Sequence, residues 1–195
     1  VIINSPSNPT GMGYSADELR AFAHVIRRHP HLMVISDDLY EHLTYDGFEF
    51  STIAGLAPDL VDRVLTLNGV SKSYCMTGWR IGFAAAPVPL VKAMAKLQSQ
   101  STSSPGSIAQ HAAVAALNGP TGFITENNAA FARRRAMVVV ALNAMDGVSC
   151  PAPDGAFYVF ADISDLIGKA RPDGKVIASD SDFAAALLEL AEVAV

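Results

Sequence analysis

Asn68-Gly69-Val70-Ser71-Lys72-Ser73-Tyr74-Cys75-Met76-Thr77-Gly78-Trp79-Arg80-Ile81-Gly82 is the most informative stretch of this chain. Lys72 follows a turn of small residues, and Arg80 comes eight positions later near two glycines. Small residues let the backbone come close to a bulky ligand. An ε-amine that acts as a nucleophile needs a shaped site, and a guanidinium suits bidentate binding of phosphate. Either residue alone would ordinarily face solvent, so the interpretation depends on the neighbouring segments.

The segments around this stretch alternate between strand and helix patterns. Strands are predicted at Val1–Asn4, His31–Ser36, Val64–Leu67, Ile81–Ala86, Val148–Cys150 and Ala156–Ala161. Helices are predicted from Ser15 to Arg28, over Val88–Leu117 with a break at Ser101–Gly106, over Pro120–Ala144, and from Ser179 or Ser181 to Leu190. Alternation of this kind favours an α/β fold, with a mainly parallel sheet sandwiched by helices.

The first helix has a clear start and a clear apolar face. Ser15 and Glu18 have the spacing of a capping box. Leu19, Phe22, Ala23 and Ile26 recur at helical spacing, so we expect them to face the core.

Polar side chains follow the predicted strands. Asn8 lies in the turn Asn8-Pro9-Thr10-Gly11 after the first strand, Asp37 ends the second, and Tyr40 comes three residues later. Open α/β sheets bind ligands beyond the carboxyl ends of their strands. A carboxylate there can pair with a protonated ring nitrogen, so Asp37 is a candidate ligand residue. For Asp38 we expect surface solvation or helix capping.

The order and spacing of these elements resemble class I aminotransferases of the pyridoxal-phosphate fold type I. The resemblance runs from Ile2-Ile3-Asn4-Ser5-Pro6 to Gly155-Ala156-Phe157-Tyr158. Met76-Thr77-Gly78-Trp79-Arg80-Ile81-Gly82 and Ser99-Gln100-Ser101-Thr102 look like the bacterial branch of aspartate aminotransferases.

This resemblance implies a cofactor site and a reaction. Lys72 would hold pyridoxal 5'-phosphate as a Schiff base and shuttle the proton, and Arg80 would bind the phosphate. Asn8 and Tyr40 would contact the phenolic oxygen, with Asn8 also bordering the substrate carboxylate, and Asp37 would pair with the pyridine nitrogen. The implied function is ping-pong transamination between an amino acid and a 2-oxo acid, with aspartate and 2-oxoglutarate as the expected pair.

Several parts of the family pattern have no counterpart here. They are the loop that cradles the phosphate, the aromatic residue that stacks on the ring and the arginine that grips the substrate carboxylate. Trp79 is in the wrong place to stack, and Gly69 stands where some relatives have serine. Both ends read as strands cut through, so we expect a fragment. It would hold an incomplete cofactor-binding domain over 1–132 and an incomplete smaller α+β domain over 133–195. Relatives act as homodimers, and Ser101–Gly106 is the segment expected to face the partner.

Other functions stay open at this stage. An alanine or aromatic transaminase, a carbon–sulfur β-lyase and a non-catalytic pyridoxal-phosphate-binding regulatory domain share the same elements. Phe157 belongs either to the core or to the substrate mouth. Cys75 lacks an evident base, and packing is the expected role.

Composition narrows the classes of partner. The net charge of −5 argues against a nucleic-acid surface. Two cysteines make no disulfide framework, and neither they nor the five histidines show metal-ligand spacing. The longest apolar stretch, Ala136–Met145, is too short for a membrane span and contains Asn143. We therefore expect no metal and no membrane, and a cytoplasmic location.

Overall fold

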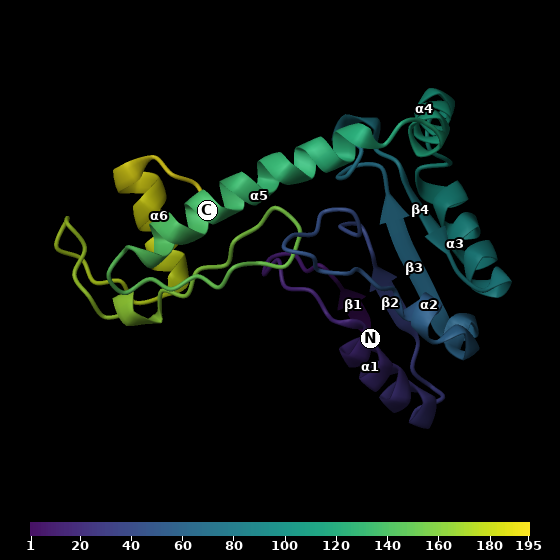
Figure 1. Ribbon diagram of the computed structural model, residues 1–195, viewed down its shortest axis with the longest axis horizontal. Coiled ribbons are helices and arrows are strands. Elements are labelled where there is room, and N and C mark those ends of the chain that lie inside the picture. The colour runs from purple at the N-terminus through teal and green to yellow at the C-terminus, as the bar shows by residue number, and fades with distance from the viewer. The chain divides into compact units, whose positions relative to one another are not determined.

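The computed structural model describes residues 1–195 and contains one mixed sheet and a series of helices (Figure 1). The strands are β1 (Ile2–Asn4), β2 (Val34–Asp37), β3 (Val64–Gly69) and β4 (Gly82–Ala85). The α-helices are α1 (Ala16–Arg28), α2 (Ile53–Leu56), α3 (Val88–Ser101), α4 (Ser107–Asn118), α5 (Gly122–Asn143) and α6 (Asp180–Ala191). The 3₁₀ helices are η1 (Pro58–Arg63), η2 (Thr77–Trp79) and η3 (Ser164–Leu166).

The chain divides into two compact units. The first comprises Val1–Arg133 and Pro153–Tyr158, and the second comprises Arg134–Ala152 and Val159–Val195. The roles predicted for 1–132 and 133–195, a cofactor-binding domain and a smaller domain, are not tested by this division and stay predictions. None of the helices combines the length and the apolar character that crossing a membrane requires.

The sheet of the first unit has the order β1-β2-β3-β4. β1, β2 and β3 pair in parallel, which confirms the expected α/β architecture, whereas β4 runs antiparallel to β3. The reason lies in the connections. Helix α1, or α2 with η1, links each parallel pair, but only the three-residue η2 lies between β3 and β4. A parallel crossover needs a longer connection, so the chain turns back beside β3.

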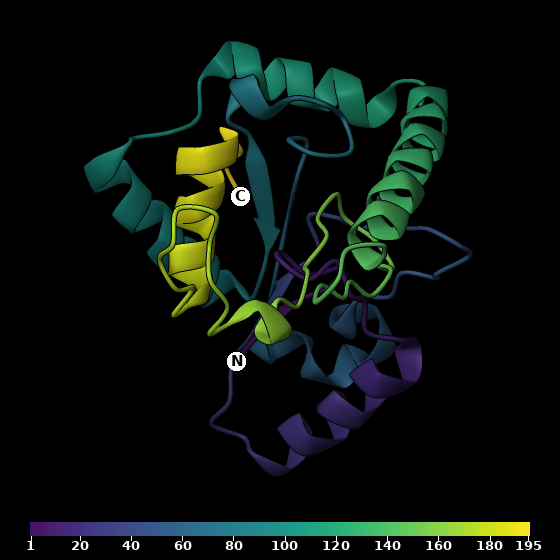
Figure 2. The ribbon, with the colours of Figure 1, turned by 90° about the vertical axis from the view of Figure 1, so that its left-hand side faces the viewer.

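The core of the first unit lies between β1–β3 and the segments α1, α2 and η1. Its buried residues are Ile3, Leu19, Ala23, Ile26, Val34, Ile53, Ala57, Leu60 and Val64. Figure 2 shows α1 next to the α2–η1 segment. Arg27 of α1 makes a bidentate ion pair with Asp59 of η1, at 2.7 and 2.8 Å, but both side chains are exposed. Burial of apolar surface, rather than this surface ion pair, therefore holds α1 on the sheet.

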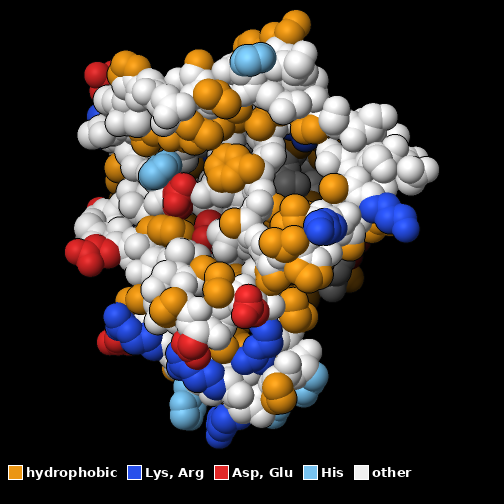
Figure 3. All heavy atoms as spheres, turned by 90° about the vertical axis from the view of Figure 1, so that its right-hand side faces the viewer, with side chains coloured by type: hydrophobic (Ala, Val, Ile, Leu, Met, Phe, Trp, Pro, Cys, Tyr) orange, Lys and Arg blue, Asp and Glu red, His pale blue; other side chains and the backbone are white.

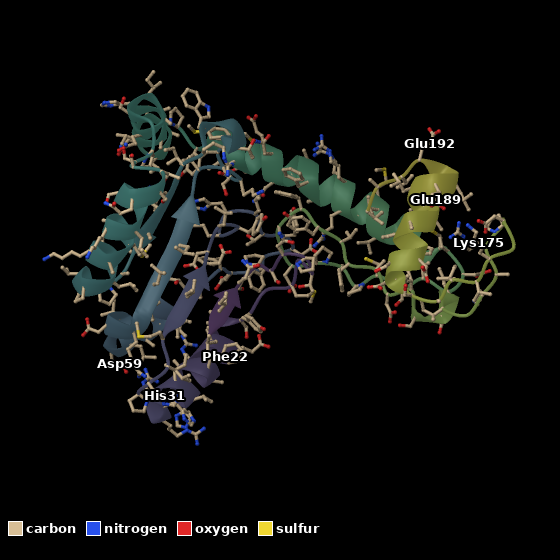
Figure 4. The ribbon with its side chains drawn as sticks, turned by 180° about the vertical axis from the view of Figure 1, so that it is seen from behind. Phe22, His31, Asp59, Lys175, Glu189 and Glu192 are labelled. Carbon is tan, nitrogen blue, oxygen red and sulfur yellow. The ribbon has the colours of Figure 1, made fainter.

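The predicted start of α1 is confirmed, and one residue of its predicted apolar face is not. The Ser15 hydroxyl accepts a hydrogen bond from the Glu18 amide, and the Glu18 carboxylate accepts one from the Ser15 amide. Phe22, labelled in Figure 4, is 37 % exposed. Its ring meets that of Tyr14 edge-on at 5.0 Å. The buried stripe is centred on Leu19, Ala23 and Ile26, so Phe22 falls at its border.

The β4 side of the first unit presents many apolar side chains to solvent (Figure 3). All four residues of β4 are exposed, and α3 buries none of its side chains. The large exposed apolar residues of this region are Phe83, Val88, Val91, Leu97, Ile108, Val114 and Leu117. The predicted break between α3 and α4 is confirmed.

The two strands predicted after α5 are extended segments instead, and the second unit contains the end of α5, η3 and α6. Val148–Cys150 and Ala156–Ala161 were expected to be strands. Of the first segment only Ser149 is paired, in an isolated bridge to Asp162, and the bridging residues Gly155 and Asp162 lie just outside the second. Prolines at 151 and 153 lack the amide donor that a longer ladder would need. Similarly, β2 begins at Val34 rather than at His31.

An acidic residue is buried at the end of β2. Asp38 is only 4 % exposed, so its expected place at the surface is wrong. Ser36 Oγ donates a hydrogen bond of 2.7 Å to Asp38 Oδ1. Burial raises the pKa of the Asp38 carboxyl, the Ser36 hydroxyl opposes that shift, and the nearby Glu41 and Asp37 carboxylates add to it. The carboxylate form of Asp38 therefore costs folding free energy.

The structure decides which serine caps α6, and this can be measured. Ser179 Oγ accepts the Asp182 amide at 3.1 Å, whereas the Ser181 hydroxyl contacts only Asp180. We expect Ser179→Ala to destabilise the helix by about 1 kcal/mol. The matched Ser181→Ala change should stay within about 0.5 kcal/mol. Hydrogen exchange of the Asp182 and Phe183 amides measures both, and equal effects of the two changes would contradict the assignment.

The buried Asp38 predicts a pH-dependent gain in stability for Asp38→Asn. The amide keeps the acceptor for Ser36 and cannot ionise. Because the folded-state pKa lies above the ordinary 3.8, the wild-type chain loses stability as pH rises from that value through the raised one. We expect equal stability at lower pH and a more stable variant at neutral pH, measured by urea unfolding. The exposed Asp62→Asn serves as the control, and a gain that does not depend on pH would refute the explanation.

Candidate functional site

The carboxyl ends of three parallel strands meet at one edge of the sheet. The register pairs Asn4 with Asp37 and Asp37 with Leu67, so β1 and β2 end side by side next to β3. The segments that carry Asn8, Tyr40 and Lys72 leave the sheet at this edge. The arrangement matches the position at which open α/β sheets bind ligands.

The turn after β1 is held by its own hydrogen bonds. The Asn8 amide donates to Asn4 Oδ1 at 2.6 Å, and the Gly11 amide donates to the Ser7 carbonyl at 2.8 Å. Gly11 has a φ of +70°, and a Cβ there would lie 2.4 Å from Cβ of Pro153. Only glycine fits this position, and the turn is thereby fixed against the 153–158 segment.

Three polar groups from distant parts of the chain form a hydrogen-bonded row. The Tyr40 and Tyr158 hydroxyl oxygens are 2.8 Å apart, and Asn8 Nδ2 lies 3.3 Å from the Tyr158 hydroxyl. Burial raises the pKa of the Tyr40 phenol, and the Tyr158 hydroxyl and then the Asp37 carboxylate raise it further. Tyr40 is therefore a protonated hydrogen-bond donor at neutral pH.

The Lys72 ammonium lies near an aromatic group formed by the rings of Tyr40 and Phe157. Its Nζ lies 5.2 Å from the centroid of the Phe157 ring and 5.9 Å from that of Tyr40, within the range of a cation–π contact. The loop that carries Lys72 follows β3. It is held in place by the fully buried side chain of Val70 and by a hydrogen bond from the Cys75 amide to the Lys72 carbonyl. Lys72 thus emerges from a fixed loop beside Tyr40.

Phe157 is not a core residue. Its ring is 41 % exposed, stacks on Phe131 at 5.8 Å and meets Tyr40 edge-on at 5.6 Å. Of the two roles that the sequence left open, the exposure beside Lys72 favours the one at the mouth of a site.

Asp37 lies at the same edge and is half-buried. Its carbonyl accepts a hydrogen bond from Asn4 Nδ2 at 3.1 Å, and its Oδ1 accepts the Leu39 amide at 3.4 Å. The long Leu39 contact leaves most of the acceptor capacity of the carboxylate unused.

Arg80 is the predicted site residue that the structure does not join to the others. It is exposed, has a φ of +56°, and donates from Nη1 to the Thr77 carbonyl at 2.9 Å. The structure therefore brings Asn8, Tyr40 and Lys72 together, with Asp37 next to them. The hydrogen bond of the Arg80 guanidinium goes to the Thr77 carbonyl rather than to any of these four residues.

Sequence reasoning missed Tyr158, although it quoted the segment that contains it. The only signal was the end of the family resemblance at Gly155-Ala156-Phe157-Tyr158.

Cys75 is exposed and 3.5 Å from Asn127 Nδ2, with no base beside it. No three His, Cys, Asp or Glu side chains gather as a metal-binding group.

The second unit has a small hollow of its own. Gly147, Val148, Ser149, Asp162, Ser164 and Asp165 line it. Hydrogen bonds from the Ser164 amide and hydroxyl lower the pKa of Asp162. These contacts stabilise the turn that begins η3.

Comparisons with known proteins extend over the whole chain. The family described as "Aminotransferase class I and II" matches residues 1–195. The aspartate/prephenate aminotransferase of Cereibacter sphaeroides is 58 % identical over 194 residues, and the aspartate aminotransferase of Rhizobium meliloti is 56 % identical over 195. Each match covers 100 % of this chain and 48 % of the relative, so the chain spans about half the length of the curated relatives it matches.

Solved structures show the same fold. The crystal structure of the Rhizobium meliloti aspartate aminotransferase has a TM-score of 0.95 at 55 % identity and covers 100 % of this chain and 48 % of that one. The aromatic aminotransferase from Pyrococcus horikoshii has a TM-score of 0.85 at 37 % identity, covering 99 % and 49 %. The fold is therefore the predicted fold type I, and the chain belongs to the class I and II aminotransferase family.

Proposed function

We propose that this chain carries the cofactor-binding lysine and most of its surrounding groups for pyridoxal-phosphate-dependent transamination. The observation that carries the proposal is the position of Lys72 Nζ, 5.9 Å from the Tyr40 ring centroid at the edge where Asp37 ends β2. Family membership over residues 1–195 supports it. Lys72 is the proposed catalytic residue.

The chemistry of the donor set fits pyridoxal 5'-phosphate. Lys72 supplies the amine that such an aldehyde needs, and the half-buried carboxylate of Asp37 suits a protonated ring nitrogen. The neutral phenol of Tyr40 and the amide of Asn8 are donors for an anionic phenolic oxygen. Arg80 is exposed and uses Nη1 for the Thr77 carbonyl, so its other N–H groups suit the phosphate.

When bound, the cofactor supplies the electron withdrawal that makes the proton on the substrate α-carbon acidic. The residues of this chain do the rest. Lys72 Nζ would accept the proton from the substrate α-carbon and would donate it to the cofactor carbon that takes up the amino group. Asp37 keeps the ring nitrogen protonated, and Tyr40 and Asn8 hold the phenolic oxygen. Asn8 also borders the proposed site of the substrate carboxylate.

Aspartate and 2-oxoglutarate are the proposed substrate pair, because the Rhizobium meliloti relative and the Rhizobium meliloti crystal structure are both named aspartate aminotransferase. A second candidate is an aromatic or prephenate-type substrate. The exposed ring of Phe157 beside Lys72 favours it, since a planar apolar side chain could stack there. The Cereibacter sphaeroides relative is named an aspartate/prephenate aminotransferase. Side-by-side assays with aspartate and an aromatic donor separate the two.

We further propose that the whole protein is a homodimer with Ser101–Gly106 facing the partner. Five of these six residues are exposed in the chain. We also propose that the protein is located in the cytoplasm.

The first test is covalent labelling of Lys72. Pyridoxal 5'-phosphate and borohydride should attach the cofactor irreversibly to Lys72, found by peptide mapping. Lys92 and Lys96 on α3 are internal controls, since they lie outside the aromatic group around Lys72. We expect label on Lys72 and none on Lys72→Ala. Label on Lys92 or Lys96 instead would show that the site is elsewhere.

The second test concerns the activity of the chain by itself. We expect little or no turnover of aspartate and 2-oxoglutarate, because the chain has no assignable phosphate loop, stacking aromatic residue or carboxylate arginine. A mispositioned substrate forfeits an orientation advantage worth roughly 7–11 kcal/mol of barrier. Val1, Ile2, Val193 and Val195 are also exposed, which favours aggregation.

The comparison protein joins this chain to the remaining length of the Rhizobium meliloti aspartate aminotransferase. That relative matches the chain over all 195 residues. The joined protein should be active, with the relative itself as the positive control and Lys72→Ala as the negative one. Comparable turnover by the 195-residue chain alone would contradict the prediction.

A further inference from the structure

We propose that Tyr158 is a positioning residue. Its hydroxyl links the side-chain amide of Asn8 to the Tyr40 phenol, and it orients the Tyr40 hydroxyl toward an anionic oxygen of the bound ligand. The identity of that ligand rests on the proposed function. The hydrogen-bonded row itself does not, since it is present in the chain without any ligand.

The donors and acceptors of the row set its direction. Asn8 Nδ2 is a donor only, so the Tyr158 oxygen accepts at that end. The 2.8 Å contact between Tyr158 and Tyr40 needs one proton. A hydrogen bond to an anionic oxygen is about twice as strong as one between neutral groups. In the presence of such an oxygen, the Tyr40 hydroxyl therefore donates its hydrogen bond to that oxygen rather than to Tyr158. Tyr158 then donates to the Tyr40 oxygen, and each bond polarises the next.

The Tyr158 hydroxyl is held in place independently of the ligand. The Ala156 amide donates to the Leu43 carbonyl at 2.8 Å, and the Gly155 amide donates to the Gly11 carbonyl at 2.9 Å. The Tyr158 ring packs 4.7 Å from that of Phe157 and 5.8 Å from that of Tyr40. This segment is therefore anchored to both the Asn8 turn and the segment after β2. Such anchoring is what a group that positions its neighbours requires.

Three groups face Tyr40, and two of them, with burial, set its ionisation. The Tyr158 hydroxyl and the Asp37 carboxylate favour the neutral phenol, next to burial itself. The Lys72 ammonium lies over the ring at 5.9 Å. Removing the Tyr158 hydroxyl takes away one of these influences and leaves Asp37, Lys72 and the aromatic packing in place.

The first experiment compares Tyr158→Phe with Tyr14→Phe in the 195-residue chain. Tyr14 loses the same atom, but its hydroxyl makes no hydrogen bond, and its ring contacts only Phe22. The chain has five tyrosines, so ¹³Cζ signals from labelled tyrosine can be followed with pH and assigned by these variants. We expect the pKa of Tyr40 to fall in Tyr158→Phe and to stay unchanged in Tyr14→Phe. An unchanged Tyr40 titration in Tyr158→Phe overturns the proposal.

The second experiment asks whether Tyr158 acts through Tyr40. It uses pyridoxal 5'-phosphate binding to the joined full-length protein and the variants Tyr158→Phe, Tyr40→Phe and the double variant. Losing one hydrogen bond should weaken binding about threefold to tenfold. The double variant should bind no worse than Tyr40→Phe alone.

The possible outcomes separate the two proposals. Additive losses would mean that Tyr158 does not act through Tyr40, which overturns the positioning role. Wild-type protein that binds no pyridoxal 5'-phosphate would overturn the proposed function instead. In that case the titration of Tyr40 still decides whether Tyr158 controls its hydroxyl.

Discussion

The parallel pairing of β1, β2 and β3 is the constraint on which the candidate site depends. Its register sets Asn4 beside Asp37 and Asp37 beside Leu67, so the strands end at one edge. Parallel strands present their carboxyl ends together, and the segments that follow them must leave the sheet side by side. Apolar burial against α1, α2 and η1 fixes this register, because a one-residue slip would turn the buried Val34 and Val64 to the other face.

A second constraint joins the site to a segment far along the sequence. Gly11 and Gly155 lie so close to proline side chains that a Cβ on either would clash, at 2.4 Å from Cβ of Pro153 and 2.4 Å from Cγ of Pro6. The Tyr45 hydroxyl donates to the Ala156 carbonyl, and the Tyr45 amide to the Asp154 carbonyl at 2.9 Å. These contacts bring Phe157 and Tyr158 to Tyr40. The sheet thus supplies one side of the site, and this anchored loop supplies the aromatic side.

Local signals predicted much of this structure. Helical periodicity and capping residues located α1, α3, α4, α5 and α6, because such information lies within a few residues. The strands predicted at Val148–Cys150 and Ala156–Ala161 were wrong, since a short apolar run forms a strand only where a partner pairs with it along its length. The direction of β4 was likewise decided by the length of a connection rather than by the strand itself.

Local sequence likewise located some residues of the candidate site and missed one that depends on distant contacts. Asn8, Asp37, Tyr40 and Lys72 could be found because each follows a strand or its turn, and the family resemblance gave their order. Tyr158 could not, because its role depends on contacts with residues more than a hundred positions away. Residue type alone gives no sign of such a partner.

The two neighbouring aspartates show how strand geometry divides chemistry between faces. Burial alternates along β2 and continues past its end, so Ser36, Asp38 and Tyr40 are buried while Ile35, Asp37 and Leu39 are half-buried. Within β2, which ends at Asp37, alternation sends successive side chains to opposite faces, and the chain turns directly after Asp38. Asp38 is therefore committed to the interior, where burial raises its pKa, and only Asp37 keeps a carboxylate open to a ligand. Of two adjacent residues of identical chemistry, burial thus leaves only Asp37 with an exposed part of its carboxylate, and Asp37 is the one proposed to pair with a ring nitrogen.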